Sequence, residues 1–193
     1  MTLQEFLRLA KLHPVAAALK TSEDMELALT CDARLLFVLK GDAFQMAPFV
    51  VEAHKHHKGV IVHIDLVSGV GKDHGGVQYL RQIGVDGIIT SRSQLVASSR
   101  AEGLVTIQRL LVLDDPTLDT GIRTIVRAAP DIVEVLPGIL FPEVAHKLFQ
   151  SLRGPFIAGG FIHTTADVAR IRDAGAILCS SSTHELWKRS DES

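Results

Sequence analysis

The sequence predicts an α/β fold, a compact (β/α)8 TIM-type barrel of parallel strands formed by a single domain over residues 1–193. Eight short apolar runs recur along the chain at intervals of roughly 20 to 28 residues, and helix start and stop signals lie between them. Dividing 193 residues by eight leaves about 24 per unit, which a strand of ~5, a helix of ~11 and two loops of ~4 residues fill. The rival architecture, an open doubly wound sheet, usually uses about five or six such units.

Each apolar run is too short for a helix and too uniformly apolar for a half-exposed strand. This pattern is typical of strands buried on both faces, as in a parallel sheet covered by helices. The predicted strands, rich in Val, Ile, Leu and Ala, are Val15–Leu19, Leu35–Leu39, Val60–Leu66, Gly87–Thr90, Leu104–Gln108, Ile132–Leu136, Phe156–Ala158 and Ala176–Cys179.

The segments between these strands begin with capping or acidic residues and end before glycine or proline, which predicts helices. Thr21 to Asp24 offer a cap and an acidic first turn to a helix over 25–30, and Pro48 is expected in the first turn of a helix ending near His57. The remaining predicted helices are 73–83, 94–102, 115–129, 143–152, 166–174 and a short one ending near Trp187. The polar tail, about residues 188–193, is expected to fray.

Composition excludes several classes of protein. With 20 basic and 22 acidic residues the formal charge is −2, and only 5% of residues are aromatic, so composition offers neither a basic footprint nor many rings for stacking bases. Neither a signal peptide nor an apolar run of the ~18 residues that a membrane span needs is visible. Cys31 and Cys179 lie far apart among apolar or small residues and are expected to be reduced core thiols. These features predict a cytoplasmic protein without membrane contact.

Polar residues lie in the last part of every predicted strand or directly after it, on the side of a barrel where ligands bind. They include Lys20, Asp65, Gln108 and Glu134. Burying so many polar groups in one barrel mouth is costly without partners, which favours a bound polar ligand. The two carboxylates have three interpretations: a pair for proton transfer, acceptors for ligand hydroxyls, or structural ion pairs with Arg109 or Arg92. The Lys20 ammonium either binds an anionic ligand at the barrel mouth or is exposed to solvent in a loop.

The last two units carry the most specific pattern. Gly159 and Gly160 follow the seventh strand, and Ser180 to Thr183 open the short final helix. Glycines let backbone N–H groups approach a phosphate, and a helix N-terminus supplies free donors and a favourable dipole. A phosphate site formed by Gly159, Gly160, Ser181 and Ser182 is the interpretation that the barrel favours; a tight glycine turn before a serine-capped helix is the alternative.

The histidines do not form a recognisable metal site. His54, His56 and His57 do not share one helical face, so no metal is expected. His63 is expected to be a core histidine rather than a catalytic group. No nucleophile stands out either, because neither cysteine has a thiolate-stabilising partner nearby in the sequence.

Several stretches taken together resemble the glycerol-3-phosphate-responsive antiterminator family, that of the glycerol uptake operon antiterminator regulatory protein. They are 63–69 (HIDLVSG), 86–91 (DGIITS), 103–109 (GLVTIQR), 130–138 (PDIVEVLPG), 157–162 (IAGGFI) and the serines at 180–182. The resemblance implies a cytoplasmic bacterial regulator with a barrel fold, not an enzyme, without a cofactor. It implies binding of glycerol 3-phosphate as effector and of the leader mRNA of a glycerol-utilisation operon, which prevents transcription termination and stabilises the transcript.

Carried over by position, Gly159, Gly160, Ser181 and Ser182 are expected to hold the phosphate of the ligand. Lys20, Asp65, Gln108 and Glu134 are expected to face its glycerol hydroxyls. Because the net charge is −2, RNA binding requires a local basic patch, for which Arg92 and Arg109 are candidates.

Two further functions and the oligomeric state stay open at this point. One is a phosphosugar enzyme that uses Asp65 or Glu134 as base, although the predicted strands contain no interior lysine for Schiff-base chemistry. The other is a metabolite sensor acting through a protein partner. A homo-oligomer, in which a second subunit completes the RNA surface, is also open.

Overall fold

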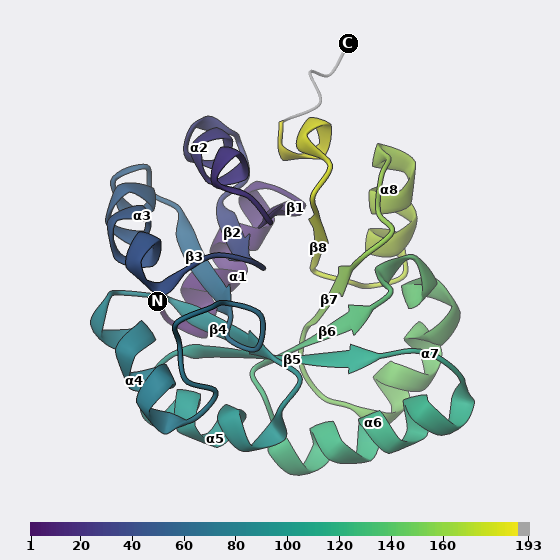
Figure 1. The fold of residues 1–193 in the computed structure, drawn as a ribbon. Coiled ribbons are helices and arrows are strands. Elements are labelled where there is room, and N and C mark those ends of the chain that lie inside the picture. Colours follow the sequence, from purple (N-terminus) through teal and green to yellow (C-terminus); the bar gives the residue numbers. More distant parts are fainter. Residues whose placement is uncertain (189–193) are drawn as a thin grey trace.

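The computed structural model describes residues 1–188 and confirms the predicted closed barrel (Figure 1). Its eight parallel strands pair in sequence order, and β8 closes the barrel against β1. Figure 1 shows the helices that connect them arranged around the outside of the strands. The tail predicted to fray lies, apart from Lys188, outside the described residues.

The strands lie close to their predicted positions. They are β1 (Val15–Leu19), β2 (Leu35–Val38), β3 (Gly59–His63), β4 (Gly87–Thr90), β5 (Val105–Leu111), β6 (Ile132–Leu136), β7 (Phe156–Gly159) and β8 (Leu178–Ser181). Three differences matter for the site: β3 ends at His63, so Asp65 lies in the following turn and not in the strand; β5 continues to Leu111; and β8 extends to Ser181.

The helices are α1 (Leu3–Leu12), α2 (Ser22–Thr30), α3 (Ala43–Lys55), α4 (His74–Gln82), α5 (Ser93–Ala101), α6 (Asp115–Ala128), α7 (Phe141–Ser151) and α8 (Thr165–Asp173), with short 3₁₀ helices η1 (Gly138–Leu140) and η2 (His184–Trp187). The start predicted for α3 was wrong. Asp42, not a residue next to Pro48, caps this helix by accepting from the backbone N–H of Phe44 at 2.9 Å, so Pro48 lies in its interior.

Helix α1 was not predicted, because it precedes the first strand and stands outside the alternation of strands and helices. Its start nevertheless carries a sequence signal, a capping box in which Thr2 and Glu5 satisfy each other's backbone N–H groups. Phe6, Leu9 and Ala10 on its buried face belong to the same apolar cluster as the side chains inside the barrel. The helix therefore covers the end of the barrel opposite the predicted ligand site.

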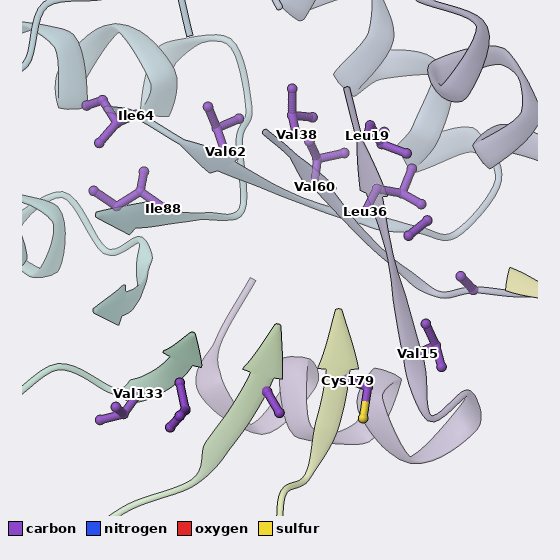
Figure 2. Close-up of a cluster of buried hydrophobic side chains, with 14 of the residues drawn as sticks. Val15, Leu19, Leu36, Val38, Val60, Val62, Ile64, Ile88, Val133 and Cys179 are labelled. Carbon is purple, nitrogen blue, oxygen red and sulfur yellow. The ribbon is translucent and has the colours of Figure 1, made fainter. Parts of the chain in front are cut away.

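Two apolar clusters hold the barrel together, as the alternation of side chains along each strand requires. One fills the barrel interior and includes Leu35, Phe37 and Ile61. The other lies between the strands and the helices and includes Val60 and Val62; Figure 2 shows part of it. Since β3 alternates in this way, His63 faces the barrel interior with Ile61.

Cys179 lies in the outer apolar cluster, as the sequence predicts for a core thiol. Burial raises the pKa of this thiol to about 12, so at neutral pH it stays protonated and is a poor nucleophile. Cys31 is also a free thiol, and it is only partly buried.

Two kinds of feature are absent from residues 1–188. No helix within residues 1–188 has both the length and the apolar character to span a membrane. Over the same residues, no three His, Cys, Asp or Glu side chains are grouped so that they could hold a metal ion.

Candidate ligand site at the barrel mouth

A cavity of about 360 Å³ opens at the carboxyl ends of β7, β8 and β1. Four of the residues predicted to bind the ligand lie together in its wall: Lys20, Gly160, Ser181 and Ser182. The others that line it are Ala18, Leu39, Arg109, Leu136, Phe161, Ile162, His163 and Ser180. The strand ends therefore bring a lysine, serines and a glycine loop to one place, as the sequence predicts.

One wall of the cavity is the loop after β7, which has an unusual backbone. Gly160 has φ +89° and Phe161 has φ +58°, so two successive residues are left-handed. A side chain in this conformation costs roughly 1–2 kcal/mol, which glycine avoids and phenylalanine does not. Strained residues of this kind concentrate at ligand-binding loops.

Another part of the cavity wall, at the end of β1, carries a lysine. Lys20 follows β1, and its Nζ donates to Ser182 Oγ at 2.9 Å. The backbone N–H of Lys20 donates to Asp24 Oδ2 at 2.7 Å, which fixes the start of the loop. Within residues 1–188 no carboxylate oxygen lies within 4.0 Å of the Lys20 ammonium. This ammonium is therefore available to an anion in the cavity.

The two serines differ in what their hydroxyls do. Ser181 Oγ donates to the carbonyl of Ile162 at 2.7 Å and accepts from the N–H of Thr183 at 3.1 Å. This hydroxyl joins the loop after β7 to the end of β8 and so holds the cavity wall in place. Ser182, which is less buried, presents its hydroxyl beside Lys20.

Beneath the cavity lies a buried polar group centred on Glu134, whose side chain is 0% exposed. Its Oε2 accepts from Arg109 Nε at 2.8 Å, and its Oε1 accepts from Ser180 Oγ at 3.0 Å. A Cβ on Gly159 would stand 2.7 Å from Glu134 Oε1 and 2.5 Å from Ser180 Oγ. Gly159 is therefore required to leave room for this group, and it does not line the cavity.

Arg109, a candidate for the local basic RNA patch, lies in the barrel mouth and not on an open surface. It follows Ile107 by two residues on β5, so both side chains point inward, and the Arg109 side chain is only 12% exposed. Arg109 also lines the mouth cavity, so it belongs to the candidate ligand site. The inward position of Ile107 was the signal that could have identified it.

Gln108 lies on the other face of β5, away from the predicted ligand. Its Nε2 donates to Ser93 Oγ at 3.0 Å, and it lines a separate cavity of about 470 Å³ beside α6. Its buried Oε1 has no hydrogen-bond partner among the described residues. A role in contacting the ligand in the mouth cavity therefore does not fit its position.

Asp65 also lies apart from the cavity. It accepts from the N–H of Ser91 at 2.7 Å and from Thr90 Oγ1 at 3.1 Å, and its Oδ1 lies 3.3 Å from Arg92 Nε. It therefore ties the turn after β3 to the loop after β4. Of the interpretations left open for the two carboxylates, structural ion pairing describes both: Asp65 with Arg92, and Glu134 with Arg109.

His63 is buried inside the barrel mouth, with 2% of its side chain exposed. Neither ring nitrogen has a hydrogen-bond partner in the described structure, and Nδ1 lies 3.9 Å from Asp65 Oδ2. Burial, with the Arg109 charge as the next cause, lowers the pKa of this imidazole to about 4. His63 is therefore neutral at pH 7, which fits a core histidine rather than a cation for phosphate.

This pKa predicts how stability depends on pH. Between pH 6.5 and 4 the unfolded chain binds a proton at His63 that the folded chain does not, so stability falls as pH is lowered through this window. At pH 5 the free energy of unfolding is about 2 kcal/mol lower than at neutral pH because of His63 alone. Urea unfolding of wild type and His63→Leu at pH 7.5 and 5.0 measures it. An equal pH dependence in the two proteins would contradict this assignment.

The close packing around Gly159 leads to a second prediction about the free energy of unfolding. The variant Gly159→Ala must displace Ser180 or Glu134, because its Cβ would lie within 2.7 Å of both side chains. We expect a loss of about 1–3 kcal/mol in the free energy of unfolding, the usual range for overpacking. Gly75→Ala is the matched control, because a Cβ there meets only Asp73 Oδ1 at 3.4 Å. Equal stability of both variants would show that the close packing around Glu134 is not a constraint.

A family model and a curated relative match most of the chain. Residues 15–187 match the model of the glycerol-3-phosphate responsive antiterminator family. Over 182 residues, 94% of this chain and 95% of the other, the sequence is 28% identical to YgcP of Escherichia coli (strain K12), a protein described as uncharacterized.

Solved structures extend the comparison. The glycerol uptake operon antiterminator regulatory protein from Listeria monocytogenes superposes with a TM-score of 0.84 at 33% identity, covering 90% of this chain and 94% of that one. A glycerol uptake operon antiterminator-related protein from Thermotoga maritima superposes with a TM-score of 0.82 at 27% identity. The match covers 92% of this chain and 99% of that one. Deoxyribose phosphate aldolase from Aeropyrum pernix, 18% identical with a TM-score of 0.71 and covering 96% and 94%, shares the barrel fold. The chain belongs to the glycerol-3-phosphate responsive antiterminator family.

Proposed function

We propose that the chain is a transcription antiterminator that binds glycerol 3-phosphate in the mouth cavity. In that state it binds the leader mRNA of a glycerol-utilisation operon, prevents premature termination and stabilises the transcript. One observation carries this proposal: in a chain of this family, the Lys20 ammonium, the Ser182 hydroxyl and the Gly160 loop converge on one cavity. This cavity follows β7 and β8, where barrels hold phosphate groups.

The cavity suits a small ligand with one anionic end. The phosphate would contact Lys20, Ser182 and the backbone around Gly160, with Ser181 holding the wall behind it. The glycerol hydroxyls would lie towards Arg109 and the Glu134 group below. Arg109 uses Nε for Glu134, and its guanidinium has further N–H donors that can reach a ligand oxygen.

Ligand and RNA binding would be coupled by a shift in population. If glycerol 3-phosphate favours the arrangement of the mouth loops that binds RNA, its binding raises the population of that arrangement. Thermodynamic linkage then requires RNA to tighten ligand binding by the same factor.

Calorimetry tests the ligand part of the proposal. Glycerol 3-phosphate is titrated into the wild-type protein, with inorganic phosphate and glycerol as separate controls. We expect one site per chain, weaker binding of phosphate, and no detectable binding of glycerol. Absence of glycerol 3-phosphate binding would overturn the proposal.

The positions of the two carboxylates support a regulator rather than a phosphosugar enzyme. Glu134 and Asp65 each lie beside their own arginine, and no lysine occurs within β1 to β8 for Schiff-base chemistry. Turnover of a triose phosphate that disappears in Asp65→Asn would favour the enzyme. Salt-dependent binding of a leader transcript would argue against a sensor that acts only through a protein partner.

A further inference from the structure

Two phenylalanines are exposed at the same end of the barrel as the ligand cavity. Phe44, which follows β2, is 90% exposed, and Phe161, which follows β7, is 70% exposed. The strands between them in the barrel are β8 and β1. The two rings therefore stand at the ends of an arc formed by four neighbouring strand ends.

Two adjoining cavities lie along the arc. The mouth cavity lies under Phe161, and a second cavity of about 310 Å³ lies over β1, β2 and the turn after β3. Lys20 lines both. The second cavity is lined by both polar and apolar residues, among them Ser22, Lys40, Gln45 and Ser68 together with Met25 and Leu66.

Among the residues that line the two cavities, Lys20, Lys40 and Arg109 outnumber the one carboxylate, Asp42. Neither Lys20 nor Lys40 has a carboxylate oxygen within 4.0 Å among the residues that the structure describes. The one carboxylate that lines the second cavity, Asp42, accepts from the N–H of Phe44 at 2.9 Å and lies 3.2 Å from Ser68 Oγ. Two lysines without a carboxylate partner among the described residues thus lie on the arc that carries the two exposed rings, although the whole chain has a net charge of −2.

We propose that single-stranded RNA binds along this arc, with bases stacked on Phe44 and Phe161 and the backbone on Lys40. This inference rests on the proposed function and adds to it the RNA-contacting surface. Exposed aromatic rings beside lysines are what unpaired bases and phosphates require, and stacking on such a ring contributes about 1–3 kcal/mol per base. A protein partner would need apolar area but not the aromatic face, and this difference separates the two occupants in a test.

The same geometry explains how the ligand could act on RNA. Phe161 lines the mouth cavity, and its left-handed backbone directly follows Gly160. A phosphate held at this loop would fix the backbone that carries the ring. Glycerol 3-phosphate would then order one of the two stacking platforms without touching the RNA.

The test uses Phe44→Leu and Lys40→Ala, because neither residue lines the ligand cavity. Binding of a fluorescein-labelled pool of random 20-nucleotide RNA is measured by anisotropy at low salt, with saturating glycerol 3-phosphate. We expect Phe44→Leu to weaken RNA binding about 5- to 100-fold. Phe44→Trp, which keeps an aromatic ring, should bind RNA about as tightly as wild type. Lys40→Ala should weaken binding and lower the salt slope by about one, whereas Lys11→Ala, at the end of α1, should not. Calorimetry should show unchanged glycerol 3-phosphate affinity in Phe44→Leu.

The outcomes separate this inference from the proposed function. RNA binding that is equal in wild type and both variants overturns the surface assigned here and leaves the antiterminator intact. If the wild-type protein does not bind glycerol 3-phosphate, the proposed function itself is overturned. Wild type that binds ligand but no RNA overturns both the surface and the RNA part of that function. Self-association, or capture of a protein partner, that survives Phe44→Leu and is lost in Phe44→Ser would show an apolar docking face instead.

Discussion

Replacing Ser182 with aspartate is expected to abolish measurable binding of glycerol 3-phosphate. The new carboxylate would stand beside Lys20, whose Nζ now donates to Ser182 Oγ at 2.9 Å, and would pair with that ammonium. It would also repel a phosphate in the same cavity. At an effective dielectric constant near 20, unit charges about 4 Å apart interact by about 4 kcal/mol, so we expect the Kd to rise at least 100-fold.

Ser182→Asn is the matched control for this experiment. It has nearly the shape of aspartate without the charge, so we expect the ligand affinity to fall about tenfold or less. Calorimetry on both variants gives the comparison, and circular dichroism checks that each is folded. Ligand binding that is unchanged in Ser182→Asp would show that the phosphate does not lie at the ends of β8 and β1.

The variant Glu134→Gln is expected to lower the free energy of unfolding by about 3 kcal/mol or more. Glu134 is fully buried and holds Arg109 at 2.8 Å, so the neutral amide leaves a mostly buried guanidinium without its counter-charge. For a chain of this size, 3 kcal/mol corresponds to a fall in Tm of about 6–12 °C. Thermal and urea unfolding measure the effect.

Two controls make this result specific to the buried pair. Glu143→Gln removes an exposed partner of Arg170, 3.6 Å away, and should cost less than about 1 kcal/mol. The double variant Glu134→Gln/Arg109→Met removes both buried charges and should recover a large part of the loss. If Glu134→Gln is as stable as Glu143→Gln, the group below the cavity does not support the site as described.

The barrel was predictable because its strands are short, apolar and regularly spaced, and because most connecting helices begin at capping residues such as Thr21 and Asp73. Two helix features were not. Helix α1 precedes the repeating pattern, and Pro48, allowed in a first turn, lies inside α3 because the Asp42 cap begins the helix earlier. A residue's compatibility with a helix start does not identify that start.

The candidate site was predictable in part, for a reason that lies in strand geometry. The end of a strand places Lys20, Gly160 and Ser182 at the mouth whatever the exact bounds. Which face a strand residue occupies depends on register, so Arg109 and Gln108, adjacent on β5, were both misplaced. The sequence left two arginines, Arg92 and Arg109, as possible partners of Glu134. The register between β5 and β6 places Arg109 directly opposite Glu134 and so identifies the partner.

The proposed coupling between ligand and RNA is tested by the binding of a leader transcript from a glycerol-utilisation operon of the same genome. Its affinity for the wild-type protein is measured at several salt concentrations, with and without saturating glycerol 3-phosphate. We expect this coupling to give tighter binding of the transcript with the ligand, and an affinity that falls as salt rises. Equal affinity for the transcript with and without glycerol 3-phosphate would contradict it.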